Sequence, residues 1–463
     1  MGNHQNPSLE PPQPSCSNKQ CLQCGESLAA YSDNNQTITC QNCNAEYPVL
    51  LFGDISIPLI FEDVDSVLFG WGARFNGFKE KIDLEISTIA KQVTDKKYSN
   101  LTRQRLKKVL SAKKHYKEQL TSLLTSIEEV SGANQLPSNI SIAKNQGIDS
   151  YINNIFRDWS WDNGENLELL ESVSDVLVEN YHAGNTLTLG AGASRLSYDF
   201  HYTFKANFST LVDINPVLLG FAANIISGNT LELEEFPIAP LSLDSFAVNQ
   251  TCELPINNNH KANEFEFILA DALNCPFEHR SFDTVLTPWL IDIVPIDFRD
   301  LIPHINRLLE VGGVWVNTGS LAFFHNNQVC NYSQEEITDL LIKYGFDEIN
   351  ISRKNINYLH SPYSAHGRVE MVFSFSARKK FECKPPVKFS YVPKWLRDYD
   401  LNIPVQDEMV DKSSKYLFQA QILSAIDGNR TIREIGELVA TQYEIDEESA
   451  CAAVKQVLLD NRA

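Results

Sequence analysis

The stretch Leu187-Thr-Leu-Gly-Ala-Gly-Ala-Ser-Arg195 decides the fold, because an apolar run turns into a glycine loop within it. The run is typical of a buried strand, and Gly190 and Gly192 follow at its carboxyl end. Glycines at that place let the backbone approach a ligand near the switch point of a doubly wound sheet. A dinucleotide loop would carry a third glycine where this chain has Arg195, so a pyrophosphate site is not supported.

Short apolar segments that alternate with helical ones continue this pattern along the chain. We expect strands at 208–213, 265–271, 282–287 and 313–317, and period-two alternation over 369–377 predicts a late antiparallel edge strand. This order is typical of an α/β fold with a Rossmann-like, doubly wound sheet.

Carboxylates stand at the ends of the second and third expected strands. Asp213 can hydrogen-bond both hydroxyls of a ribose, and Asp271, followed by Ala272, can accept a hydrogen bond from an adenine amino group. Each could alternatively be a solvated turn residue. Together with the glycine loop and Gly312-Gly313 before the fifth strand, they predict S-adenosyl-L-methionine (SAM) as the cofactor and a class I methyltransferase fold.

Four of the ten cysteines form a metal-ligand pattern: Cys21-Leu-Gln-Cys24, then fifteen residues, then Cys40-Gln-Asn-Cys43. Two knuckles of this spacing let four thiolates converge on one Zn²⁺ and leave no open coordination position for catalysis. We therefore expect a structural zinc ribbon, with a redox or iron centre as the alternative.

The formal net charge of −20 argues against a protein that coats nucleic acid. Residues 96–117 are a basic exception: they form either a solvated helix face or a site for an anionic partner. In the first case the positions that pack inward are Leu101, Leu106, Val109 and Leu110. Without an export signal or a long apolar run, we expect a cytoplasmic protein that has no membrane partner.

Composition and patterning divide the chain into six segments. They are a disordered lead at 1–18, the zinc ribbon at 19–60, a helical region with linker at 61–150, the methyltransferase domain at 151–382, a linker at 383–404 and a small helical or winged-helix domain at 405–463. In the last segment, Asp427-Gly-Asn-Arg-Thr431 resembles a turn of PqqD-like winged-helix domains, which implies a peptide or protein partner; a dimerisation or packing domain is the alternative.

Several phrases between about 151 and 380 are distinctive. They are Asn154-Ile-Phe-Arg-Asp-Trp-Ser160, the glycine loop, Thr287-Pro-Trp-Leu-Ile-Asp292, Asn317-Thr-Gly-Ser-Leu-Ala-Phe-Phe-His325, Tyr332-Ser-Gln-Glu-Glu-Ile and Lys343-Tyr-Gly-Phe. Together they resemble the carnosine N-methyltransferase family. The resemblance implies that Asn154 and Arg157 touch SAM, as does the glycine loop with Arg195. It also implies that Asp292 binds a substrate imidazole and that His325 contacts the substrate.

The departures from the family pattern are specific. Asn154 is shorter than the family's Gln, Ser194 replaces a usual glycine, and Pro288 stands where another residue lines the SAM pocket. The segment of His325 is one residue longer, and Tyr363 is the counterpart of a late Tyr contact. We therefore expect SAM use to carry over, with a substrate that differs from carnosine or is larger.

The leading hypothesis is an N-methyltransferase for an imidazole in a small molecule, a peptide or a protein histidine. Asp292 would fix the ring tautomer and accept the proton, His325 would orient the substrate, and Trp289 and Phe324 would wall the acceptor pocket. Alternatively, Asp292 is a helix N-cap and His325 a packed core histidine. An RNA methyltransferase and a SAM-binding peptide-recognition scaffold without turnover are the competing functions.

Overall fold

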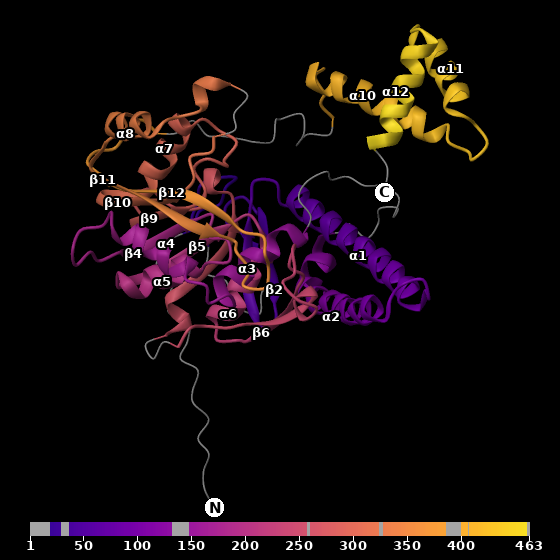
Figure 1. The fold of residues 1–463 in the computed structure, drawn as a ribbon. Coiled ribbons are helices and arrows are strands. Elements are labelled where there is room, and N and C mark those ends of the chain that lie inside the picture. Colours follow the sequence, from indigo (N-terminus) through magenta and orange to yellow (C-terminus); the bar gives the residue numbers. More distant parts are fainter. Residues whose placement is uncertain are drawn as a thin grey trace, which may run out of the picture. The chain divides into compact units, whose positions relative to one another are not determined.

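The computed structural model describes residues 19–28, 37–131, 148–256, 260–323, 327–385, 400–405 and 407–460 (Figure 1). The chain forms two compact units, Met1–Phe389 and Ser390–Ala463. The expectations about residues 1–18, Phe324 and His325 concern residues that lie outside these described ranges.

A ten-stranded sheet in the order β1-β2-β3-β8-β5-β4-β9-β10-β12-β11 organises the first unit. Neighbours from β8 to β10 pair in parallel, and β12 is antiparallel to both β10 and β11. The bounds are β4 Gly184–Leu189, β5 Ala206–Asp213, β8 Phe265–Ala270, β9 Phe282–Pro288, β10 Leu309–Gly319, β11 Phe346–Tyr358 and β12 Arg368–Lys379. This is the strand order of a class I methyltransferase, so the expected fold and the late antiparallel strand are confirmed.

Burial on both faces explains why these segments read as continuous apolar runs. Every residue of β8 is buried, as expected for a parallel strand that is covered by helices. Helices α4 (Glu165–Ser174) and α5 (Arg195–Thr203) share one buried cluster with β11 and β12, whereas α7 (Phe298–Leu308) and α8 (Gln334–Lys343) belong to another. α6 (Pro216–Ile226) is buried along its whole length.

The cysteine-containing segment extends this sheet. β2 (Glu46–Phe52) pairs with β1 (Thr37–Thr39) on one side and with β3 (Ile55–Ile60) on the other. β3 in turn pairs in parallel with β8, through Leu59 opposite Leu269 and Ile60 opposite Ala270. The predicted ribbon segment is thus continuous in hydrogen bonding with the sheet.

Two long helices, α1 (Val64–Thr94) and α2 (Asn100–Ser131), contact each other over much of their length. The buried positions of α2 begin at Ala112 and include Tyr116, and Leu101 is 56% exposed, so Leu101 was wrongly expected to pack inward. Two of the basic residues pair with α1, Lys113 with Glu85 at 2.9 Å and Lys117 with Asp83 at 2.7 Å. These pairs favour the reading of residues 96–117 as a solvated helix face.

A hairpin that the sequence pattern did not reveal, β6 (Leu231–Glu235) with β7 (Val248–Cys252), carries the buried Glu235. Its carboxylate accepts hydrogen bonds from Trp161 Nε1 at 3.0 Å, from Gln250 Nε2 at 2.5 Å and from Ser361 Oγ. One carboxylate therefore ties together the segment after α3 (Ile152–Trp159), the hairpin and the loop after β11.

The second unit consists of α10 (Asp407–Ser424), α11 (Ile432–Tyr443) and α12 (Glu447–Asp460) around a small apolar core. Thr431 and Glu434 form a capping box that begins α11. Residues 400–405 and 407–460 contain no strand, so of the two expected forms, helical and winged-helix, the structure shows the helical one. None of the described helices is long and apolar enough to cross a membrane.

Glu235→Ala should lower the free energy of unfolding by about 2–4 kcal/mol, because it leaves buried donors of Trp161, Gln250 and Ser361 without their acceptor. Denaturant titration measures the change. Glu232→Ala, an exposed position on the same strand, is the control and should change stability little. Equal stability of the two variants would contradict the inference that the hydrogen bonds accepted by Glu235 stabilise the fold.

Candidate functional site

The loop after β4 is built from backbone conformations that L side chains rarely adopt. Gly190, Gly192 and Ser194 have φ angles of +70°, +56° and +70°. A Cβ at Gly190 would lie 3.0 Å from Leu290 Cδ1, so this position also lacks space for a side chain. Ser194 thus stands at a position whose backbone favours glycine, and the usual family glycine has a physical reason.

Asp213 joins this loop to the end of β5. One carboxylate oxygen accepts a hydrogen bond from Gly192 N at 2.7 Å and the other accepts one from Asn215 N at 2.7 Å. Burial raises the pKa of the Asp213 carboxyl, while these N–H donors oppose the rise. Each carboxylate oxygen can accept more than one hydrogen bond, so Asp213 retains capacity for a ligand hydroxyl.

Asp271 follows the last residue of β8, at the same edge of the sheet. Its carboxylate accepts a hydrogen bond from Leu273 N at 2.9 Å, and burial raises its pKa. The neighbouring Ala272 is buried. Because β4, β5 and β8 are adjacent and parallel, the glycine loop, Asp213 and Asp271 meet at one edge.

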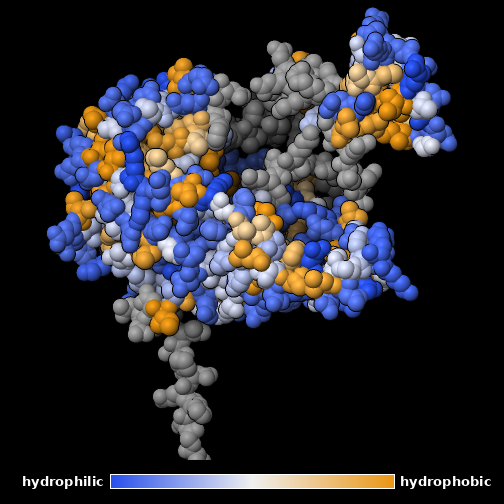
Figure 2. All heavy atoms as spheres, viewed as in Figure 1, coloured by the Kyte–Doolittle hydropathy of each residue, from blue (hydrophilic) through white to orange (hydrophobic). Residues whose placement is uncertain are grey.

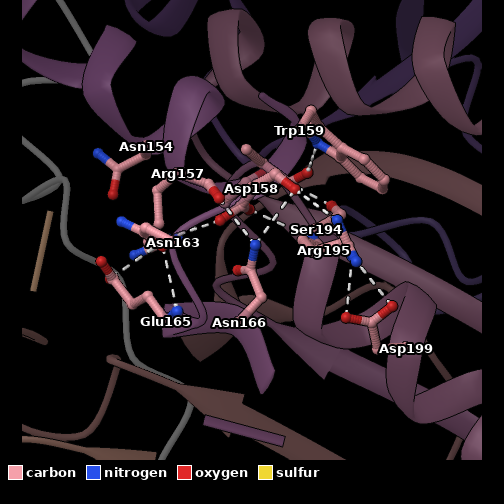
Figure 3. Close-up of polar contacts among 12 residues, drawn as sticks. Asn154, Arg157, Asp158, Trp159, Asn163, Glu165, Asn166, Ser194, Arg195 and Asp199 are labelled. Atoms are coloured by element: carbon pink, nitrogen blue, oxygen red, sulfur yellow. Dashed lines mark hydrogen bonds and ion pairs between the residues drawn. The ribbon is translucent and has the colours of Figure 1, made fainter. Parts of the chain in front are cut away.

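Residues of helix α3 hydrogen-bond the glycine loop (Figure 3). Trp159 Nε1 donates to Ala193 O at 2.7 Å, and Asp158 Oδ2 accepts from Arg195 N at 3.2 Å. The guanidinium of Arg195 donates to Asp158 O at 2.9 Å and to both oxygens of Asp199 at 3.0 and 2.8 Å. Arg195, which we expected at the cofactor, therefore has protein partners that fix the start of α5.

Arg157 and Asn154 lie three residues apart on α3 and so share one side of the helix (Figure 3). Arg157 Nε donates to Asp158 Oδ1 at 2.6 Å and lies 3.9 Å from Glu165 Oε1, and Asn154 Nδ2 donates to Tyr151 O at 3.3 Å. Glu165 was not predicted. Burial raises the pKa of its carboxyl to about 7, although Arg157 opposes the rise. Sequence shows Glu165 only as an acidic residue in the first turn of a helix, which is common for dipole reasons.

The segment after β9 forms a second group. Pro288 is buried, and Trp289 N donates to Thr318 O at 2.8 Å with a φ of +51°. The Trp289 ring lies 4.6 Å from the Tyr358 ring, and its buried Nε1 has no hydrogen-bond partner among the described residues.

Asp292 is 8% exposed and connects the loops after β9 and β10. Its Oδ2 accepts hydrogen bonds from Ser320 Oγ and, at 3.1 Å, from Ala322 N. The N-cap of the following helix α7 is Asp297, so Asp292 is not the helix cap that was its alternative role.

Tyr363 belongs to a different group of residues. It is 36% exposed and lines a cavity of about 570 Å³ together with residues of α2 and of the segment 242–249. Neither Trp289 nor Asp292 lines this cavity. The structure does not bring Tyr363 together with Asp292 there.

The four predicted cysteines converge, with their sulfur atoms all within 4.8 Å of one another. Cys21 and Cys43 are 3.5 Å apart, and Cys24 and Cys40 are 3.6 Å apart. Both knuckles close through a residue with positive φ, Gly25 at +81° and Asn44 at +59°, whose N–H groups donate to Cys21 O and Cys40 O.

Ser194→Gly should raise the free energy of unfolding by about 1 kcal/mol, because it removes the Cβ from a left-handed backbone position. Ser194→Ala keeps that Cβ and is the matched control, which should show no gain. Chemical denaturation compares the two variants; a gain in both, or in neither, would show that the loop holds no strain at this residue.

No curated protein matches the chain significantly. Solved structures that it resembles include phosphoethanolamine N-methyltransferase 2 of Haemonchus contortus, in complex with phosphomonomethylethanolamine and S-adenosylhomocysteine (20% identity, 42% of this chain, 39% of that chain, TM-score 0.27). A second is the N-methyltransferase NodS of Bradyrhizobium japonicum WM9 (13% identity, 48% of this chain, 99% of that chain, TM-score 0.31). A third is M. jannaschii TYW2 in complex with AdoMet (13% identity, 48% of this chain, 78% of that chain, TM-score 0.28). At these identities and scores they indicate nothing about substrate.

The family model for carnosine N-methyltransferase matches residues 134–384, more than half of the chain. The matched region contains the glycine loop, both strand-end carboxylates and Asp292. The chain therefore belongs to the carnosine N-methyltransferase family of SAM-dependent methyltransferases.

Proposed function

We propose that the protein transfers a methyl group from SAM to a ring nitrogen of an imidazole, carried by a small molecule, a peptide or a protein histidine. The observation that carries this proposal is the buried carboxylate of Asp292, held by Ser320 and Ala322 between the loops after two central strands. A carboxylate fixed in this way suits a heterocycle with one N–H to donate.

The residues at the sheet edge fit SAM. The Asp213 and Asp271 carboxylates suit the ribose and the adenine amino group, the glycine loop allows close approach, and Arg157 suits the carboxylate of the methionine part. Glu165 Oε2 is buried without a hydrogen-bond partner in the described part of the chain, which fits a neighbouring polar ligand. SAM, when bound, supplies an electrophilic methyl group on a sulfonium.

Asp292 would accept a hydrogen bond from one imidazole nitrogen, so that the other nitrogen keeps its lone pair toward the methyl group. As the ring becomes positively charged, the carboxylate stabilises it and can take the proton. Trp289 and Tyr358 would form an apolar wall that excludes water, and the unpartnered Trp289 Nε1 could donate to a substrate acceptor. Phe324 and His325 remain proposed substrate contacts, His325 in an orienting role, and Tyr363 is proposed as a contact for a part of a larger substrate that lies away from Asp292.

Asp292→Asn should lower kcat for methylation of carnosine or histidine-containing peptides by about 10²–10⁴-fold, because the amide cannot take the proton. Transfer of labelled methyl measures the rate, mass spectrometry locates the label, and calorimetry should find SAM affinity nearly unchanged. Asp300→Asn, an exposed position on α7, is the control. Imidazole methylation at the wild-type rate in Asp292→Asn would refute the assigned role, and label on another acceptor would refute the substrate class.

We also propose that Cys21, Cys24, Cys40 and Cys43 hold a structural Zn²⁺. A tetrahedral site with Zn–S distances of about 2.3 Å places sulfur atoms about 3.8 Å apart, close to the distances of 3.5 and 3.6 Å in this cluster. All four positions would be filled by thiolate, which excludes a catalytic role for this site.

Protein purified without added zinc should contain about one Zn²⁺ per chain, and Cys21→Ser combined with Cys40→Ser should abolish it. Elemental analysis measures the metal. Replacing Cys330 and Cys383, which lie outside the cluster, should leave the metal content unchanged. A metal-free wild-type protein would contradict the site.

The C-terminal unit is proposed as a module for a peptide or protein segment. Hydrophobic residues gather on part of the face of this unit that Figure 2 shows. Its exposed apolar side chains include Leu417 and Leu438, which are 62% and 52% exposed and support this proposal. RNA methylation has less support, because several lysines of residues 96–117 have acidic partners within the protein.

A further inference from the structure

The cysteine cluster adjoins the turn of Asp271 from both sides. Just before Asp271, Leu269 and Ala270 pair with Leu59 and Ile60 of β3. Just after it, Gln20 N donates to Pro276 O at 2.8 Å, and residues 19 and 277 form an antiparallel bridge. Gln20 directly precedes Cys21, so the first knuckle is attached to the chain that leaves the turn.

The second attachment comes through the hairpin. Cys43 is followed by β2, and β2 pairs with β3 from Val49 opposite Pro58 to Phe52 opposite Ile55. The cysteine segment therefore holds the strand before Asp271 through β3 and the loop after Asp271 through residues 19 and 20.

The cysteine segment and the region around the Asp271 turn also share one hydrophobic core and one buried ion pair. Cys21, Cys40 and Tyr47 belong to the same buried cluster as Ala272 and Phe277. The Lys19 ammonium lies 2.5 Å from the Glu266 carboxylate, and the two side chains are only 7% and 9% exposed. A buried charge that loses its partner is costly, so this pair couples the order of residue 19 to the order of β8.

We propose that metal binding at the four cysteines holds the Asp271 turn in the conformation that receives the adenine of SAM, so that metal and SAM bind cooperatively. Lys19 and Gln20 are the positioning residues of this coupling. The proposal rests on the proposed SAM and zinc sites. A segment of this size depends on its metal for order, and without that order β8 would lose its neighbour β3 and the Asp271 turn would lose its partner at Pro276.

Gln20→Pro in the full chain separates this coupling from metal binding itself. The substitution keeps all four cysteines and removes the N–H that donates to Pro276 O. We expect about one Zn²⁺ per chain as in the wild type, with the Kd for SAM raised at least about fivefold. The Kd for 5′-methylthioadenosine, which keeps the adenine, ribose and methylthio groups but lacks the amino-acid part of SAM, should rise by a similar factor. Gln20→Ala keeps the N–H, is the matched control, and should bind both ligands like the wild type.

A reciprocal measurement on the unchanged protein covers the case in which Gln20→Pro does not fold. Coupling is symmetric, so saturation with S-adenosylhomocysteine should raise zinc affinity, measured by chelator competition, by the factor by which zinc raises affinity for that ligand. Wild-type affinities in a folded, zinc-loaded Gln20→Pro, or a zinc affinity independent of S-adenosylhomocysteine, would overturn the proposal. Failure of the wild type to bind SAM at all would instead refute the proposed function, so the two failures are distinguishable.

Discussion

The hydrogen bond from Gly192 N to the Asp213 carboxylate is the contact on which the rest of the site depends. It links the loop after β4 to the end of β5, and it can form only because Gly190 and Gly192 accept positive φ angles. Trp159 and Asp158 then hold the outer side of the same loop. The loop is thus held through its backbone N–H and C=O groups, and the Asp213 carboxylate is oriented before any ligand binds.

Acidic side chains outnumber basic ones around the glycine loop. Arg157 and Arg195 contact three largely buried carboxylates, those of Asp158, Glu165 and Asp199. Burial raises the pKa of Glu165 to about 7, so the folded state keeps a proton that the unfolded state releases as the pH rises from about 4.5. The unfolded state binds fewer protons in this window, so this group's contribution to stability falls between about pH 4.5 and 7. Above about pH 7, where Glu165 is ionised, three carboxylates face two guanidinium groups, and a cationic ligand such as SAM suits that excess of negative charge.

The parts of the fold that could be predicted from sequence depend on local patterning. The five parallel strands and the cysteine knuckles carry their own signals, and the family pattern marks Ser194 only as a replacement for a usual glycine, whereas its positive φ comes from the structure. Glu235 could not be predicted, because its partner Ser361 is 126 residues away and only the folded chain brings them together. The prediction that Leu101 packs inward was wrong. Helical spacing predicts which side of α2 is apolar, but it does not predict at which residue along the helix burial begins. Site roles resting on family likeness, such as those of His325 and Tyr363, are still predictions.

Strand β8 would be the exposed edge of the sheet if the chain began after β3. An edge strand presents unpaired N–H and C=O groups, and every side chain of β8 is apolar or buried, so that edge would invite association with other strands. β3 covers the edge, and the cysteine segment holds β3 in place. The same contacts that protect the edge also border Asp271. Protection of the sheet edge and support of the Asp271 turn, the proposed adenine site, are therefore two results of one packing arrangement, so a substitution that weakens one should weaken the other.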